Sequence, residues 1–248
     1  MTKANFFNQG DYTARFEWGY EGVQHVGPGS SIVVIIDVLS FSTCVDVVVG
    51  RGGIVFPYRM KDESAGIFAE EKKAILAGKR GEPISLSPAC LRTIPQNSRI
   101  VLPSPNGSTC TVLAKECDAM VIAACLRNAS AVASFIRQQK GTVTIIACGE
   151  RWSNGALRPA IEDMVAAGAI LHELKGHRLS VEAQIAVAAF LSAKRELSSI
   201  LEQSGSGQEL IRKGYPEDVY IAAQYNVSQN VPILNDECAY EAVVVNGA

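Results

Sequence analysis

The sequence predicts an α/β protein of three layers (α/β/α), with helices packed on both faces of a largely parallel sheet. Through about residue 174, short apolar segments alternate with longer segments of helical periodicity, which is the pattern of successive βαβ units. Several apolar segments are rich in Val and Ile and have no polar face, as strands covered on both sides do. Hydrophobic residues make up 48% of the 248 residues and charged residues 19%, which is enough apolar surface for a large core.

The individual elements follow from this periodicity. We expect strands at residues 32–37, 53–56, 99–102, 119–124 and 142–147. We expect helices at residues 42–50, 62–77, 108–115, 128–139, 159–174, 181–201, 205–214 and 217–225, and closing strands near Val231 and Val243. No linker divides the chain, so we expect residues 1–248 to form a single unit.

Residues 78–95 contain Gly, Pro and Ser without helical or strand periodicity. A connection of this length inside a compact domain is usually functional, either as a lid or as a contact with a substrate. Ser85, Ser87 and Pro88 are therefore candidate contacts.

Charge and cysteine content exclude several classes of protein. The formal net charge is 23 − 25 = −2, so there is no excess of positive charge for general nucleic-acid binding. The longest apolar runs are too short to span a membrane, and the N-terminal residues lack the layout of a signal peptide, so we expect a cytoplasmic protein. The seven cysteines form no C-x-x-C pair, which predicts reduced thiols rather than a disulfide scaffold or a zinc ribbon.

Polar residues follow three of the expected strands, at the positions where ligands bind in open α/β sheets. The first group is Asp37, Ser42 and Thr43. A buried carboxylate at a strand end needs a compensating partner, usually a cation, and the two hydroxyls stand where a helix begins. The alternative is that all three residues cap the helix, and such a cap stabilises by about 1 kcal/mol.

The second group is the turn of Asn106, Gly107, Ser108 and Thr109, which opens a helix. Glycine lets the backbone approach a ligand closely, and a helix N-terminus attracts anions through its free N–H groups. This turn is therefore a candidate phosphate or sulfonate site, with the two hydroxyls of the first group beside it. An ordinary turn followed by a helix cap explains the same residues equally well.

The third group begins with Glu150, Arg151 and Arg158 and continues with Glu162 and Asp163 in a helix that is otherwise apolar. Burial of uncompensated carboxylates is costly, so a positive group must compensate them. The helix dipole accounts for one acid in the first turn but not for Glu150 as well. The two arginines suit the anionic groups of a substrate, although a lone exposed Arg is more often a solvated surface residue.

Together these groups predict a site for a divalent cation. Asp37, Glu150, Glu162 and Asp163 offer oxygen ligands without a nearby pair of His or Cys residues, which is the preference of Mg²⁺. We expect Asp37, Glu150 and one or both acids of the adjacent pair to hold or orient this ion.

The three groups together resemble the 2-phosphosulfolactate phosphatase family, Mg²⁺-dependent enzymes that hydrolyse a phosphate ester on a small sulfonated hydroxy acid. The segments that carry the resemblance are IDVLSFST (36–43), SPNGST (104–109), ACGERWSNGALRPAIEDMVAAGAI (147–170) and SGQELIRKGYPEDVYIAA (206–223). The resemblance implies a three-layer α/β/α fold with two related halves and a magnesium site near the strand ends. It implies site roles for Asp37, Asn106, Gly107, Glu150, Glu162 and Asp163.

The chain departs from the family pattern at two places. Ser40, followed by Phe41, stands where many relatives carry an Arg after Asp-Val-Leu. A longer segment of the family, with Gly-Phe-Asp and Gly-Asn-Ser-Pro, is reduced here to residues 85–88. Both changes remove polar or charged groups that would bind an anionic ligand, so they affect the identity of the substrate more than the class of reaction.

We therefore expect an Mg²⁺-dependent phosphoric monoester hydrolase that acts on 2-phosphosulfolactate, with Asp37, Glu150 and Glu162 as catalytic residues. The attacking group is either water or the carboxylate of Asp37. The alternatives are a non-catalytic anion-binding protein and a phosphatase of the same fold that acts on another phosphorylated metabolite. The apolar helix around residues 187–191 packs either internally or against a second copy in a homodimer.

Overall fold

The computed structural model describes residues 6–60 and 62–243, and over these residues it contains one sheet of nine strands and a separate two-stranded hairpin. The strands of the sheet are β1 (Ala14–Trp18), β2 (Ile32–Ile36), β3 (Ile54–Tyr58), β4 (Ile75–Leu76), β5 (Arg99–Pro103), β6 (Met120–Ala124), β7 (Val143–Ala147), β10 (Pro232–Leu234) and β11 (Tyr240–Ala242). The hairpin pairs β8 (Glu150–Arg151) with β9 (Leu157–Arg158). The helices are α1 (Gly19–Val26), α2 (Phe41–Val49), α3 (Glu63–Glu71), α4 (Pro88–Leu91), α5 (Gly107–Lys115), α6 (Ala129–Arg137), α7 (Ile161–Glu173), α8 (Val181–Ala193), α9 (Leu197–Gln203), α10 (Gly205–Arg212) and α11 (Pro216–Ala223), with short 3₁₀ turns η1 (Phe6–Asn8) and η2 (Leu126–Asn128).

The large sheet consists of two parallel groups of strands joined by a hairpin. The strand order is β1-β7-β2-β6-β10-β11-β3-β5-β4. The first four strands pair in parallel, and so do the last three. Between the groups, β6–β10, β10–β11 and β11–β3 all pair antiparallel. Three successive reversals mean that the two parallel groups run in opposite directions.

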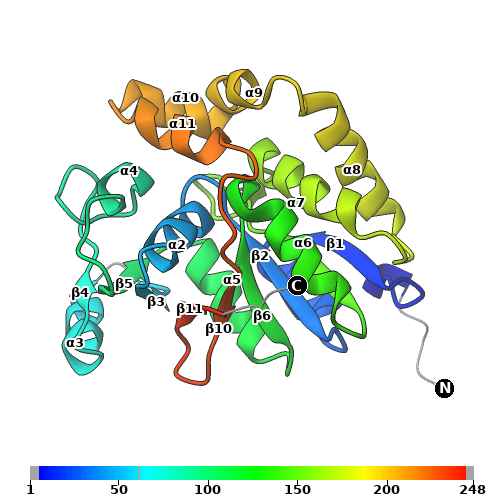
Figure 1. Ribbon diagram of the computed structural model, residues 1–248, viewed down its shortest axis with the longest axis horizontal. Helices are drawn as coiled ribbons and strands as arrows, with labels where there is room; N and C mark the ends of the chain where they lie inside the picture. Colours follow the sequence, from blue (N-terminus) through cyan, green and yellow to red (C-terminus); the bar gives the residue numbers. More distant parts are fainter. Residues whose placement is uncertain (1–5, 61, 244–248) are drawn as a thin grey trace.

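Two helices cross between these groups of strands. The chain passes from β2 through α2 to β3 in the other group, and it returns from β5 through α5 to β6. One buried cluster contains side chains of both groups, such as Val33 of β2 and Leu102 of β5, together with Val45 of α2 and Cys110 of α5. Figure 1 shows α2 and α5 between β3 and β2. As a consequence, the beginnings of α2 and α5 meet even though their strands lie far apart in the sheet.

The opposite face of the first group of strands is covered by α6, α7 and the later helices. Along β2, alternate residues point to opposite faces: Ile35 belongs to the cluster around α2 and α5, whereas Val34 and Ile36 pack with Val165 and Ile170 of α7. Both faces of this strand are therefore buried, and the three-layer α/β/α class with a largely parallel sheet is confirmed.

Most expected elements are present, but one expected helix ends early and another is divided in two. The five expected strands correspond to β2, β3, β5, β6 and β7 to within two residues. The helix expected at 62–77 ends at Glu71, because Lys73 adopts a left-handed φ of 49° and the chain then enters β4. The helix expected at 181–201 is divided into α8 and α9. This break lets Leu197 and Leu201 turn into the core.

The sequence periodicity does not reveal β1, α1 or α4. β1 lies at the edge of the sheet and carries Arg15 and Glu17 within its five residues, so it lacks the apolar run of the central strands. α4 is a four-residue helix inside the segment 78–95 that lacked periodicity. Each is too short or too polar for a periodic pattern to appear.

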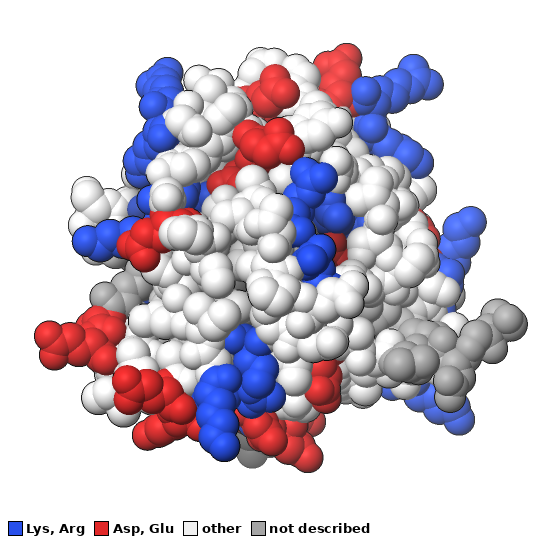
Figure 2. Space-filling view, turned by 60° about the vertical axis from the view of Figure 1, so that its left-hand side comes forward, with Lys and Arg blue, Asp and Glu red and all other residues white. Residues whose placement is uncertain are grey.

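Two general properties of the molecule bear on the classes excluded above. On the face shown in Figure 2, Lys and Arg side chains occur in separate groups interspersed with Asp and Glu. Of the helices within the described residues, none has the length and apolar character needed to cross a membrane.

Candidate active site

Asp37 follows β2 and connects the two crossing helices. Its buried carboxylate accepts hydrogen bonds from the backbone N–H groups of Phe41 at 3.2 Å and Gly107 at 2.9 Å, and from the hydroxyl of Ser104 at 3.3 Å. Phe41 and Gly107 are the first residues of α2 and α5, so two helix N-termini direct their positive ends at one carboxylate. The polar groups that follow β2 and β5 are therefore brought together.

Gly107 makes this meeting of helices sterically possible. A Cβ atom at this position would lie 2.3 Å from Cδ1 of Phe41, far inside the contact distance of two carbon atoms. The Phe41 ring is fully buried and packs edge-on against Tyr240, with ring centroids 6.2 Å apart, so it has little room to move away. Glycine is required here because the two helices approach each other closely.

Acidic side chains gather near Asp37. Burial raises the pKa of Asp37 itself, and the charge of Glu162 adds to the increase. Burial raises the pKa of Glu150 to about 7, with further contributions from the charges of Asp37 and Glu162. Burial, followed by the same two charges, raises the pKa of Asp163 well above its usual value. Among the described residues, none of the four acids forms an ion pair with Lys or Arg. No basic side chain of the described residues therefore compensates their mutual repulsion.

The four acids differ in how much of their bonding capacity is in use. Asp163 accepts from the backbone N–H of Val38 at 2.8 Å with one oxygen and from that of Gly149 at 2.9 Å with the other. It therefore fastens together the loops that follow β2 and β7. By contrast, Glu162 is buried and accepts no hydrogen bond from the described part of the chain.

Asn106 links the second and third groups. Its Nδ2 donates to Oε2 of Glu150 at 3.0 Å. Its Oδ1 is buried and has no hydrogen-bond partner among the residues that the structure describes. A buried amide oxygen without a donor is rare in folded proteins, and this one lies beside carboxylates that lack basic partners.

These donors suit a divalent cation bound by few protein ligands. Over residues 6–60 and 62–243, no three His, Cys, Asp or Glu side chains are arranged as a complete metal-binding group. Mg²⁺, however, commonly binds through only one or two carboxylates and fills its other positions with water and substrate oxygens. The oxygens of Asp37, Glu150 and Asn106 are compatible with such a site, since all three residues line one cleft.

This cleft has a volume of about 520 Å³ and is the place where the acids meet basic side chains. Arg80 and Lys213 line it together with Glu209 and Tyr215. Arg80 is held by an ion pair with the buried Asp218, by a hydrogen bond to Oγ of Ser40 at 3.2 Å, and by the face of the Tyr215 ring, 5.4 Å from its centroid. Its guanidinium therefore has a fixed position at the cleft.

The sequence reasoning did not identify Arg80, Glu209, Lys213 or Tyr215 as site residues. Two signals pointed to their segments. Arg80 belongs to the aperiodic stretch 78–95, which was expected to contact a substrate, and the other three belong to the SGQELIRKGY segment that carries part of the family resemblance. Within the aperiodic stretch, Ser87 does not line the cleft but donates to Asp218 at 2.6 Å.

Three of the predicted phosphate-binding hydroxyls are engaged with the backbone. Ser42 Oγ donates to the carbonyl of Asp37 at 2.8 Å, and Thr43 Oγ1 donates to that of Val38 at 2.7 Å. Ser108 Oγ donates to the carbonyl of Leu102 at 2.9 Å. These bonds hold the strand-to-helix turns, but they are not helix caps, because the hydroxyls donate to carbonyls and accept from no N–H group of α2 or α5. Of the predicted phosphate-binding residues, Asn106 alone lines the cleft; it is not lined by Ser42, Thr43, Gly107, Ser108 or Thr109.

The two predicted substrate-binding arginines lie on the hairpin, Arg151 on β8 and Arg158 on β9, and neither lines this cleft. The guanidinium of Arg151 lies over the Tyr20 ring, 3.8 Å from its centroid, and its Nε and Nη2 atoms are buried without a partner among the described residues. The guanidinium of Arg158 lies 5.6 Å from the centroid of Trp152. Stacking on aromatic rings orients both groups.

The fold and the cleft together define an enzyme of the α/β class that acts on a small anionic molecule. Strand ends and helix N-termini converge on a space lined by carboxylates, an amide and two basic side chains, as is usual for ligand sites in such folds. The chain belongs to the 2-phosphosulpholactate phosphatase family, because the model of that family matches residues 21–237. The family membership expected from the motifs is thereby confirmed.

Several relatives carry the same name. The chain is 28% identical over 213 residues to the 2-phosphosulfolactate phosphatase of Methanothermobacter thermautotrophicus, which covers 84% of this chain and 88% of that protein. It is 27% identical over 217 residues to a probable 2-phosphosulfolactate phosphatase of Pseudothermotoga lettingae, with 83% and 90% covered. A similar protein of Gloeobacter violaceus, also called probable, is 36% identical over 110 residues, with 44% of each chain covered.

Proposed function

We propose that this protein is an Mg²⁺-dependent phosphatase that hydrolyses 2-phosphosulfolactate to sulfolactate and inorganic phosphate. The observation that carries the proposal is the cleft of about 520 Å³, in which Asp37, Asn106 and Glu150 share the lining with Arg80 and Lys213. This volume is in the usual range for a site that binds a small metabolite. The mixture of acids and bases suits a substrate that carries several negative charges together with a divalent cation.

Arg80 supports a sulfonated substrate despite the departure at position 40. Many relatives carry an Arg where this chain has Ser40, and the guanidinium of Arg80 lies within hydrogen-bond distance of the Ser40 hydroxyl, at 3.2 Å. The guanidinium of Arg80 thus lies close to position 40, where many relatives carry an Arg. Its planar fork is suited to a sulfonate or carboxylate, and Lys213 adds a second positive charge.

Mg²⁺ would be held by Asp37, Glu150 and the free Oδ1 of Asn106, with Glu162 as a further buried negative charge near them. When bound, Mg²⁺ supplies positive charge that stabilises the charge developing on the phosphoryl oxygens. We assign Asp163 a positioning role, because it does not line the cleft and its two oxygens fasten the loops that follow β2 and β7. The cation would also relieve the repulsion among these acids.

The residues of the chain supply two routes for attack on phosphorus. Glu150, whose pKa burial raises to about 7, is suited to accept a proton from an attacking water near neutral pH. In the other route the carboxylate of Asp37 attacks directly. Trapping of an aspartyl-phosphate at Asp37 would establish the second route, and its absence during turnover would establish the first.

Phosphate binding is assigned to Asn106, which lines the cleft. Gly107, Ser108 and Thr109 of the first turn of α5 are assigned a supporting role, because the Gly107 N–H is bonded to Asp37 and the positive end of the helix lies beside the site. The hydroxyls of Ser42 and Thr43 contribute by holding the turn at the start of α2. We also propose that Arg151 and Arg158, on the β8–β9 hairpin, contact the substrate. The support for Arg151 is its two buried nitrogens that lack a partner among the described residues.

The proposal also covers the cellular compartment and the oligomeric state of the enzyme. Seven free thiols suit the reducing conditions of the cytoplasm. On α8, Val181, Ile185 and Leu191 are more than half exposed, and we propose that they pack against a second copy in a homodimer. Sedimentation of the wild type and of Ile185→Glu tests this point, because a dimer that depends on α8 would dissociate in the variant.

The central test is phosphate release from 2-phosphosulfolactate by the purified protein. We expect turnover that stops on addition of a chelator, returns with Mg²⁺, and is lost in Asp37→Asn. The matched control is Asp236→Asn, which removes an exposed acid in the turn between β10 and β11 and should turn over as the wild type does. Unchanged turnover in Asp37→Asn would refute the assignment of the site.

The same assay separates the two alternatives. Thermal stabilisation by 2-phosphosulfolactate without phosphate release, over a panel of phosphate esters with Mg²⁺, would show an anion-binding protein. Turnover of another phosphorylated hydroxy acid, with none of 2-phosphosulfolactate, would show a phosphatase with a different substrate. Both outcomes would contradict the proposed reaction.

A further inference from the structure

A second cleft, of about 510 Å³, lies at the far end of α2. α2 begins at Phe41, beside Asp37, and the second cleft is lined by residues at its other end, from Asp46 to Gly50. The nine residues of this helix span about 13 Å, so the two clefts are separate. The rest of the second cleft is lined by Arg51, Arg92, Arg127 and residues 227–230.

The lining of this second cleft carries an excess of positive charge. It contains three arginines and a single carboxylate, that of Asp46, which leaves a formal charge of +2. Polar groups dominate the remainder, with the side chains of Ser228, Gln229 and Asn230. Like charges gathered in one pocket repel each other, and a bound anion would relieve this repulsion.

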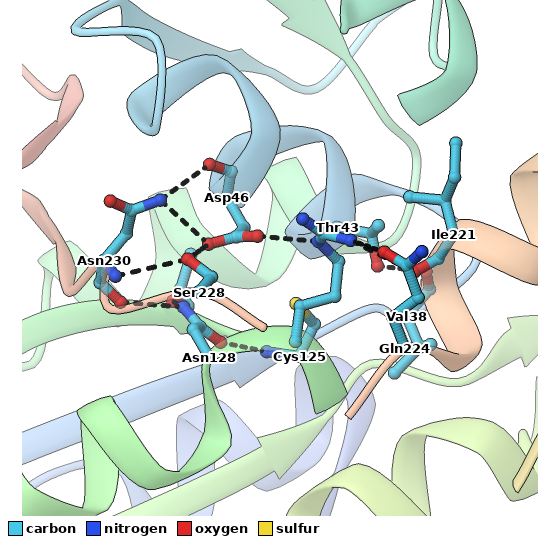
Figure 3. Close-up of polar contacts among 11 residues, drawn as sticks. Val38, Thr43, Asp46, Cys125, Asn128, Ile221, Gln224, Ser228 and Asn230 are labelled. Carbon is cyan, nitrogen blue, oxygen red and sulfur yellow. Dashed lines mark hydrogen bonds and ion pairs between the residues drawn. The ribbon is translucent and has the colours of Figure 1, made fainter. Parts of the chain in front are cut away.

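Asp46 cannot neutralise the other arginines, because it is already saturated. Its buried carboxylate accepts from Nε of Arg127 at 2.8 Å, from Oγ of Ser228 at 2.5 Å and from Nδ2 of Asn230 at 3.2 Å. Figure 3 shows Asp46 with Ser228 and Asn230 beside it. The Arg127 guanidinium is further fixed by Gln224 and by the carbonyl of Ile221. Asp46 and Arg127 therefore have fixed positions in the lining of the second cleft.

Arg51 and Arg92 have bonding capacity to spare. Arg51 uses Nε to donate to the carbonyl of Ile94 at 2.8 Å, and within the described part of the chain its two terminal nitrogens have no hydrogen-bond partner. Arg92 pairs with Glu217 at 3.3 Å, but the two side chains are 58% and 57% exposed, so solvent weakens this pair. The terminal nitrogens of Arg51 can therefore form two-pronged bonds with an anion, and an anion can displace the exposed carboxylate of Glu217 from Arg92.

We propose that this cleft is a second ligand site, which binds a small anion with at least two negative charges, such as a phosphate, sulfonate or polycarboxylate compound. Arg51 and Arg92 supply the charge-assisted hydrogen bonds, and the side-chain amide of Gln229 supplies a neutral donor that orients the ligand. Val47 and Val227 are the main apolar side chains in the lining. This apolar surface is too small to bind a large apolar ligand.

Ligand binding here should stabilise the whole structure measurably. Arg92 follows α4, whose Ala89 N–H donates to Asp218 of α11 at 3.1 Å, and Arg127 is bonded to Gln224 at the end of α11. An anion shared by Arg51 and Arg92 would therefore tie together α2, α4 and the segment after α11. Stabilisation of the folded state by a ligand is expected to appear as a rise in the unfolding temperature.

The experiment is calorimetric titration with inorganic phosphate, pyrophosphate and tricarballylate at 150 mM salt with a chelator present, supported by thermal unfolding. The variants are Arg51→Gln/Arg92→Gln in the second cleft, Arg92→Gln alone, and Lys213→Gln in the catalytic cleft. Arg92→Gln removes no buried contact, so it is expected to fold. Arg195→Gln, an exposed arginine outside both clefts, is the matched control for net charge.

For at least one of these anions we expect a binding event whose Kd rises at least tenfold in Arg51→Gln/Arg92→Gln and several-fold in Arg92→Gln. The same event should be unchanged in Lys213→Gln and Arg195→Gln. The preferred anion then identifies the ligand as a phosphate or a carboxylate compound. The inference is overturned if all binding is lost in Lys213→Gln, if Arg195→Gln weakens binding as much as the double variant does, or if no anion binds to the wild type.

Discussion

Replacement of Glu150 by glutamine should stabilise the cation-free protein while it abolishes phosphate release. The ordinary glutamate pKa of 4.5 is raised to about 7 at this position by burial and by the charges of Asp37 and Glu162. The folded protein therefore binds more protons than the unfolded chain between these two values, so its stability falls as pH rises through this window. Glutamine has the same shape and carries no charge, so the variant lacks this loss.

The magnitude follows from the size of the shift. A displacement from 4.5 to about 7 corresponds to about 3 kcal/mol at pH 8 and to less than about 1 kcal/mol at pH 5. Because Glu150 is partly exposed, solvent screening reduces the gain, and we expect about 2 kcal/mol at pH 8. For a chain of this length, that gain should raise the unfolding temperature by roughly 4–8 °C.

Urea unfolding at pH 5 and pH 8, with a chelator present, measures this effect. Glu202→Gln, which removes an exposed acid on α9, is the matched control and should give the same unfolding curves as the wild type at both pH values. Addition of Mg²⁺ at pH 8 should stabilise the wild type more than Glu150→Gln. A gain that is absent, or equally large at pH 5, would refute the idea that a repelled, buried carboxylate is maintained at this site.

Other predictions concern the surroundings of the same cleft. Gly107→Ala should destabilise by about 1–3 kcal/mol in urea unfolding, although alanine normally favours helices, because its Cβ would collide with Phe41; an unchanged midpoint would contradict the close helix approach. Ser108→Ala should lose about 1 kcal/mol of stability with KM for the phosphate ester changed less than twofold, since its hydroxyl bonds to Leu102; a large rise in KM would instead show direct phosphate binding. Arg80→Lys should raise KM about tenfold with little change in kcat, because the charge beside Asp218 remains while the fork is lost; equal kinetics would exclude Arg80 from substrate binding. Finally, kcat/KM should fall with acidification as Glu150, with a pKa of about 7, becomes protonated; this limb should move to lower pH at higher Mg²⁺ concentration, and a profile indifferent to Mg²⁺ would separate Glu150 from the cation.

The central strands could be predicted because they are buried on both faces. Ile32 to Ile36 is an uninterrupted apolar run, and such a run has few other places in a folded chain. The polar residues that follow it were correspondingly easy to single out as candidates. Their meeting with the α5 turn, however, has a different cause from the one expected. The two parallel groups run in opposite directions, so the ends of β2 and β5 meet through the crossing helices rather than along one edge of a parallel sheet.

The sequence alone could not predict which groups the polar side chains bond to. The pattern of Ser42, Thr43 and Ser108 is compatible with both a cap and an anion cradle, and only the geometry reveals that their hydroxyls donate to backbone carbonyls. The role of Arg80 could not be predicted for another reason. Its role depends on a partner at position 218, in a helix near the other end of the chain, and no local periodicity indicates a pairing of such long range.

The position of the β10–β11 hairpin has a consequence for how the molecule is made. These strands bridge the two oppositely directed groups, yet in the chain they come after every other strand of both groups. Until they emerge, the nascent chain must keep the inner edges of β6 and β3 unpaired, and such edges invite association with other chains. We therefore expect chaperones that bind nascent chains to remain bound until the hairpin has emerged, and expect removal of the hairpin to yield insoluble protein rather than a smaller active one.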